Sequence, residues 1–152
     1  MSNEASDVAD WFLAHIDRSA GDVLTHLRLQ KLVYYAQAWH LAQTEDAIFD
    51  EEIQAWAHGP VVPSLFEKYR EFKFNPIPAP DTIPVFDDTT ERVLESVLEV
   101  YGEHSAKALE RMTHRELPWI EARSGLPPEA RSNAVIPKKR MLSFYKEAAE
   151  AE

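Results

Sequence analysis

The chain has 152 residues, of which 45% are hydrophobic and 28% charged, and its formal net charge is −10. This length suits one domain with a substantial core, and no stretch approaches the roughly 18 uninterrupted apolar residues that a membrane span needs. The negative charge disfavours a phosphate backbone as partner, so we expect no nucleic-acid binding and regard a basic protein as the better match. Plain solubility explains the same charge without any partner.

The sequence shows little sign of catalytic or redox chemistry. It contains no cysteine, and its acidic start lacks the apolar core of an export signal, so a cytoplasmic location is expected. The six histidines include no pair at metal-binding helical spacing beside an acid, and the four glycines form no phosphate-binding loop. The acidic run 50–52 contains neighbouring carboxylates, but such a run in a loop is usually solvated. We expect no metal, no cofactor and no enzymatic activity.

Residues 6–16 have the pattern of a first short helix. Ser6 suits the N-cap position, because its hydroxyl is able to accept a backbone N–H of the first turn. Four side chains are expected to pack on the next helix, namely Trp11, Phe12, His15 and Ile16. His15 and, further along, His40 lie on apolar helix faces, so both are predicted to be core histidines.

Residues 25–42 form the most strongly apolar segment and predict a central helix. Apolar residues recur at spacings of three and four on two neighbouring faces, so other elements must cover most of this helix. We therefore expect Leu32 to be fully buried and Thr25 to act as the N-cap. One strip is polar and consists of Gln30, Lys31, Tyr34 and Gln37. It is a solvated strip, a contact face for a partner, or a layer packed under residues 53–57.

The segment after the central helix predicts a short extended piece, a turn and a helix. Residues 52–57 alternate partly between apolar and polar side chains, which indicates a short extended or β segment. A turn follows at residues 58–60, where a glycine precedes a proline and is kept out of the right-handed helical region. Pro63 suits the first position of a helix that buries Tyr69 and reaches about residue 72.

Cap signals predict the remaining helices. Residues 87–90 cap a helix that Gly102 ends, and Ser105 caps another helix that reaches about residue 112. Residues 113–116 have the shape of a capping box in front of a short helix that Pro118 opens. A last helix is expected over 137–149.

Proline recurs through residues 74–84, which excludes a helix and predicts an extended arm over the surface. The segments on either side are too small to be separate domains. The pattern predicts a mainly α fold, a compact single-domain bundle of about six or seven helices around a central buried helix. At most a short extended or β segment lies near 52–57. The domain is expected to span 1–152, with a core from about 7 to 145.

Several short motifs occur together in a specific order. They are Leu29-Gln30-Lys31-Leu32 with Tyr34-Tyr35-Ala36, the acidic turn 49–52, Ala55-Trp56, and His58-Gly59-Pro60-Val61-Val62-Pro63. A weaker downstream pattern is Thr113-His114, Pro118-Trp119 and Ala122-Arg123. In this order the motifs resemble the SocA-like antitoxins, a family also called the Panacea or phage-associated GepA-type domain.

The resemblance implies a small helical antitoxin that neutralises a cognate protein toxin by direct binding. It also implies an alternative role as an adaptor that delivers the toxin to the ClpXP protease. No appended DNA-binding segment is present, so promoter autoregulation is not expected. A small-molecule enzyme is a third hypothesis, which requires polar groups converging in a pocket.

The motif residues are the candidate partner-binding residues. They are Gln30, Lys31, Tyr34, Gln37, Trp56, His58, Gly59, Pro60 and Tyr69. For Trp56, Gly59 and Pro60 a structural role in fixing the turn after the central helix is favoured over direct toxin contact, because motifs that determine a fold outnumber contact motifs in packed domains. With that structural role, partner specificity is expected in the arm 74–84 and in the C-terminal helix.

Overall fold

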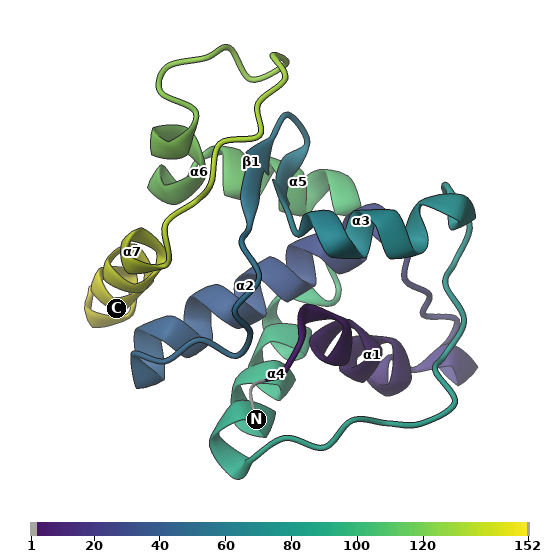
Figure 1. The fold of residues 1–152 in the computed structure, drawn as a ribbon. Helices are drawn as coiled ribbons and strands as arrows, with labels where there is room; N and C mark the ends of the chain where they lie inside the picture. Colours follow the sequence, from purple (N-terminus) through teal and green to yellow (C-terminus); the bar gives the residue numbers. More distant parts are fainter. Residues whose placement is uncertain (1–2, 152) are drawn as a thin grey trace.

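Helix α2 (His26–Thr44) runs through the middle of the molecule, and the other helices pack around it (Figure 1). The computed structural model describes residues 3–151. The other elements, in chain order, are α1 (Ala5–His15), η1 (Arg18–Ala20), β1 (Gln54–Trp56), β2 (Gly59–Val61), α3 (Pro63–Tyr69), η2 (Arg70–Phe72), α4 (Asp88–Tyr101), α5 (Ala106–His114), α6 (Leu117–Ala122) and α7 (Lys138–Glu150). Seven α-helices and one two-stranded sheet in the described residues confirm the predicted mainly α fold.

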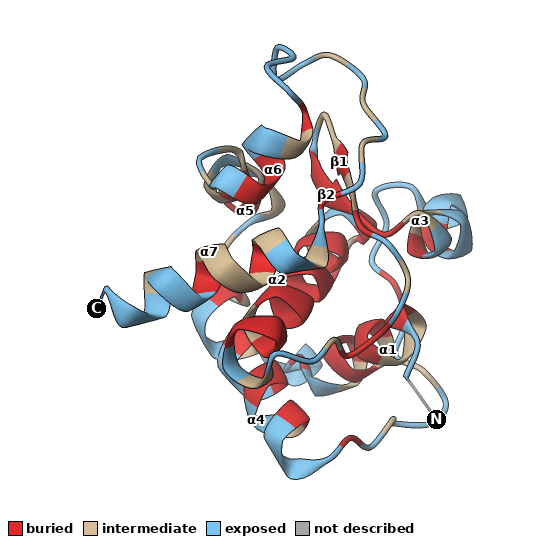
Figure 2. Ribbon diagram, turned by 60° about the vertical axis from the view of Figure 1, so that its left-hand side comes forward, coloured by how far each residue is buried: buried red, intermediate tan, exposed pale blue. Residues whose placement is uncertain are grey.

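The prediction of a central buried helix is confirmed. Of the 19 residues of α2, 14 are buried, and Figure 2 shows this helix almost wholly in the colour of buried residues. Leu32 has no exposed surface. Thr25 occupies the N-cap position as predicted, but its side chain accepts no hydrogen bond there, so the predicted cap contact is wrong.

Two predictions about α1 are also wrong. Its N-cap is Glu4 rather than Ser6, and the side chain of Asp7 accepts the backbone N–H of Glu4 at 2.8 Å to complete a capping box. His15 is exposed rather than buried, and it stacks on the ring of Trp11 with 3.9 Å between ring centroids. Trp11 itself is buried, as predicted.

The extended segment predicted near 52–57 is confirmed as strand β1. It pairs antiparallel with β2, with Ala55 opposite Pro60. The sequence did not reveal β2, because its short Gly-Pro-Val run is typical of a turn. Residues 134–136 cover the outer edge of β1, since Ile136 donates its N–H to the carbonyl of Ile53 at 2.8 Å. Strand β1 therefore has a hydrogen-bonded neighbour on both sides.

The connections and the remaining caps agree with the sequence except at one place. The proline-rich arm contains no helix, and Ile77 ties it to the core by donating its N–H to Leu24 at 2.9 Å. Asp87 and Ser105 accept backbone N–H groups at the starts of α4 and α5. The predicted capping box at 113–116 is wrong, because α5 continues to His114. No helix in the described residues is long and apolar enough to cross a membrane.

Candidate functional site

The polar strip of α2 is buried, and its interpretation as a solvated strip is wrong. Gln30, Lys31 and Tyr34 are each 1% exposed, and Gln37 has no exposed surface. A buried polar group destabilises the fold unless it is hydrogen-bonded. The partners of these four side chains therefore determine what the strip does.

Two glutamines hold the backbone of the segments that follow α2. The side-chain oxygen of Gln30 accepts the N–H of Val62 at 2.9 Å, and its amide nitrogen donates to the carbonyl of the same residue at 3.3 Å. Gln37 accepts the N–H of Ile48 and donates to the carbonyl of Phe49, both at 2.8 Å. Gln30 thus positions the start of α3, and Gln37 positions the loop at residues 48–49.

A cluster of hydroxyl groups links α2 to the C-terminal half of the chain. Tyr35 and Tyr145 both donate to one carboxylate oxygen of Glu116, at 2.7 and 3.0 Å. Because the Tyr145 proton is used in this way, the hydroxyl of Tyr34 donates to Tyr145, over 3.0 Å. Burial raises the pKa of the Glu116 carboxyl and those of the tyrosine hydroxyls. The cluster joins α2 to α7 and to the junction of α5 and α6.

Lys31 is the exception in the strip. Its ammonium is buried and has no hydrogen-bond partner among the described residues. Burial lowers the pKa of Lys31 to about 8, although the charge of Glu110 opposes that effect. The side chain of Lys31 lies directly under the hairpin, against Gly59.

Gly59 is required by this arrangement for two reasons. Its φ of +116° is a conformation that residues with a side chain rarely adopt. A Cβ atom at this position would lie 2.6 Å from Cε of Lys31 and 3.1 Å from the hydroxyl oxygen of Thr113. The close approach of the hairpin to α2 and α5 therefore depends on the missing side chain.

The hairpin presents half-buried Trp56 and exposed His58 to a groove. This groove has a volume of about 760 Å³ and is lined by half-buried Trp56 and Phe66, by His58, and by the loop 129–133. The Trp56 and Phe66 rings lie 5.0 Å apart in an edge-to-face arrangement. The indole N–H of Trp56 donates to the side chain of Gln54 at 2.8 Å, which fixes the orientation of the ring.

Arg123 holds the wall of the groove in place. Its guanidinium donates to the carbonyls of Ala55 at 2.9 Å, Pro127 at 2.7 Å and Ala130 at 2.6 Å. It also lies over the ring of Trp119, at 4.6 Å from the centroid. Sequence reasoning placed both residues only in the weaker downstream pattern and missed this role. No sequence signal indicates an arginine whose partners are backbone carbonyls.

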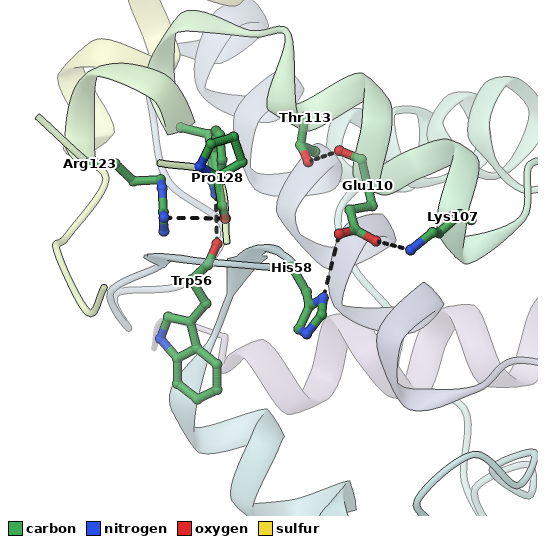
Figure 3. Close-up of polar contacts among 8 residues, drawn as sticks. Trp56, His58, Lys107, Glu110, Thr113, Arg123 and Pro128 are labelled. Atoms are coloured by element: carbon green, nitrogen blue, oxygen red, sulfur yellow. Dashed lines mark hydrogen bonds and ion pairs between the residues drawn. The ribbon is translucent and has the colours of Figure 1, made fainter. Parts of the chain in front are cut away.

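Next to the groove, the carboxylate of Glu110 faces the imidazole of His58 and the ammonium of Lys107 (Figure 3). Its carboxylate lies 3.5 Å from Nδ1 of His58 and 3.7 Å from the ammonium of Lys107. The charge of Glu110 acts on the buried Lys31, but the close contacts of its carboxylate are with His58 and Lys107.

The structure brings together only some of the candidate residues. Lys31, Trp56, His58, Gly59 and Pro60 meet at the hairpin, and Gln30 reaches it through its bonds to the start of α3. The other three, Tyr34, Gln37 and Tyr69, are buried elsewhere along the core.

Aromatic and charged side chains make up much of the lining of the groove. Residues 3–151 contain no group of three or more His, Asp or Glu side chains that could hold a metal ion. The groove instead combines aromatic rings with charged side chains of both signs at its wall, Glu129 and Arg131. Tryptophan and arginine are enriched at the energetic centres of protein interfaces.

Comparison with known protein families gives one match. The sequence model of the family described as "Antitoxin SocA-like, Panacea domain" matches residues 29–120. This span begins in α2 and ends in α6, so it includes the polar strip, the hairpin and the helix that carries Glu110. Searches of curated proteins and of solved structures give no match.

Proposed function

The chain belongs to the family of SocA-like antitoxins with a Panacea domain, and we propose that it neutralises a cognate protein toxin by binding it directly in the cytoplasm. The observation that carries this proposal is the family match over 29–120, a span that contains the groove residues Trp56, His58 and Phe66. No catalytic group is needed for neutralisation by direct binding.

The geometry supports two separate roles for the motif residues, one in positioning the fold and one in contacting a partner. Gln30, Gln37 and Tyr34 use their polar atoms on other parts of the same chain, so their role is to position the fold. Trp56 and His58 reach the surface and are the motif residues that we assign to partner contact. The groove wall is fixed in advance by Arg123, and a preorganised surface loses less conformational entropy on binding.

The proposal is tested by expressing the chain together with the product of the neighbouring reading frame. We expect the neighbour alone to arrest growth, co-expression to restore growth, and the two proteins to purify as a complex. A non-toxic neighbour, or growth rescue without a complex, would contradict neutralisation by direct binding. Measuring the half-life of the neighbour with and without an ATP-dependent protease separates simple blocking from delivery for degradation.

The contact surface is tested by a matched pair of substitutions. Trp56→Ala removes an aromatic ring from the groove and is expected to weaken both rescue and co-purification. Phe74→Ala removes a ring that is 84% exposed on the proline-rich arm and is expected to change neither. If Phe74→Ala weakens rescue and co-purification and Trp56→Ala does not, the contact surface lies on the arm and not in the groove.

A further inference from the structure

A second groove lies between α2 and α4, away from the family motif's hairpin. It has a volume of about 260 Å³, and its apolar lining consists of Trp39, Val93, Val97, Val100 and Tyr101. This volume is below the range of roughly 300–1,000 Å³ that is usual for small-molecule sites. A single large apolar side chain of a partner protein is the better match.

The apolar lining remains partly open to solvent. Val100 is 55% exposed, and Trp39 is half-buried with its indole N–H held by the hydroxyl of Tyr101 at 2.9 Å. This hydrogen bond satisfies the polar atom of Trp39 and fixes its ring. The groove therefore offers a rigid apolar surface.

An acidic strip runs along α4 beside this groove. Glu95 and Glu99 on α4, and Glu103 in the turn directly after it, follow one another at intervals of four residues and are all exposed. On α4, Ser96 and Val100 lie between this strip and the apolar lining. The acidic strip and the groove thus form one continuous surface.

The acidic strip is unfavourable for α4 itself. Like charges four residues apart repel one another on a helix, and none of the three carboxylates has an ion pair among the described residues. Glu99 lies in the last turn of α4 and Glu103 lies two residues beyond its end, where the helix dipole is negative and basic residues are favoured. No basic residue occupies the last turn of this helix.

Neighbouring cations do not neutralise the surface. Lys146 of α7 is paired with Glu45 at 3.1 Å, and the Arg28 guanidinium donates to the backbone carbonyls of His104 and Val23. Arg92 lies three residues before Glu95 on the same face of α4 but forms no ion pair with the three carboxylates. A basic partner would therefore meet three carboxylates without ion pairs beside an apolar groove.

We propose that the α2–α4 groove docks a basic amphipathic helix of the partner protein. One apolar side chain of that helix enters the groove beside Trp39, and lysine or arginine side chains at four-residue spacing face Glu95, Glu99 and Glu103. Helices bind grooves in this way through anchors that recur every three or four residues. This assignment rests on the proposed function, because it names a second surface for the toxin, besides the groove at Trp56 and His58, and the chemistry by which that surface recognises it.

The direct test uses a labelled synthetic helical peptide with leucine on one face and lysine on the other. We expect it to bind the wild-type protein at low ionic strength. The triple variant Glu95→Gln, Glu99→Gln, Glu103→Gln is expected to lower the association rate by about tenfold, and high salt should remove the difference. Ser96→Trp, which fills the groove, is expected to abolish binding without a change in the charge of the protein.

The matched control changes the same number of charges on other faces: Glu71→Gln, Asp81→Asn, Glu150→Gln. It is expected to bind the peptide like the wild type. Equal weakening by both triple variants would show a response to net charge alone and overturn the assignment. Absence of binding to the wild type, or undiminished binding to Ser96→Trp, would also overturn it.

Growth rescue separates this assignment from the proposed function. If the wild-type chain fails to neutralise the neighbouring gene product, the antitoxin proposal fails. If the wild type neutralises it and both the acidic-strip variant and Ser96→Trp do so equally well, only the assignment of the α2–α4 groove fails.

Discussion

Lys31 gives the sharpest test of the structure, because a buried ammonium without a hydrogen-bond partner must destabilise the fold. Its pKa is about 8 in the folded protein and has an ordinary value of 10.5. This difference corresponds to about 3 kcal/mol of unfavourable free energy when both states carry the proton. Replacing the ammonium by a methionine side chain of similar length is expected to remove that penalty.

The sign of the pH dependence follows from the two pKa values. Between about 8 and 10.5 the unfolded chain holds a proton on Lys31 that the folded protein has released. The unfolded state therefore binds more protons in this window, and the free energy of unfolding rises with pH. Lys31→Met should be more stable than the wild type by about 3 kcal/mol at pH 7 and by only about 1 kcal/mol at pH 9.5.

The assay is urea denaturation of both proteins at a series of pH values, with the difference in unfolding free energy as the readout. Ionisation of the buried tyrosines lowers stability at high pH, because burial raises their pKa values in the folded state, but both proteins contain them and the difference cancels this effect. Lys139→Met, at an exposed position, is the control. The difference between its unfolding free energy and that of the wild type should be the same at every pH. A difference for Lys31→Met that stays constant from pH 7 to 9.5 would refute the reasoning.

Four further outcomes are expected. Leu32→Ala should cost roughly 2–5 kcal/mol, and an unchanged urea midpoint would exclude full burial. Gly59→Ala should cost about 2 kcal/mol or more, whereas Gly21→Ala, with φ of +91° but no neighbour within 4 Å, should cost only about 1 kcal/mol; equal costs would rule out the close approach of the hairpin. Gln37→Leu leaves a buried N–H and a buried carbonyl unpaired and should cost about 3 kcal/mol in thermal or urea unfolding. Burial raises the pKa of Glu116, so the wild type should lose stability relative to Glu116→Gln as the pH rises through that pKa; pH-independent differences would contradict its burial.

The helices could be predicted from the sequence because their signals are local. The four-residue intervals in α4 and the side chains of Asp87 and Ser105 define starts and faces without knowledge of the rest of the fold. The second strand could not be predicted, since Gly59-Pro60 is typical of a turn and its pairing with β1 depends on the close approach to Lys31.

The site was harder to predict because polarity along a helix does not reveal burial. Periodicity identified Gln30 and Gln37 as one strip, but their partners are backbone groups 11 to 32 residues away. His15 and His40 gave the same sequence signal and differ in the structure, because only His40 meets polar partners inside the core, at Thr90 and Asp46. Such partners are determined by tertiary contacts.

The contacts of α2 explain why polar residues form the strongest motif of a buried helix. Apolar packing is not directional, so it does not fix the backbone position of a loop that has no regular hydrogen bonds of its own. Gln30 and Gln37 supply directional bonds to Val62 and to residues 48–49, where no regular element could do so. The motif thus specifies the path of the backbone between α2 and α3. The outer face of α4 has no part in this network, so substitutions there should change stability by less than about 0.5 kcal/mol. Partner recognition through α4 is therefore free to differ between chains that share the same core.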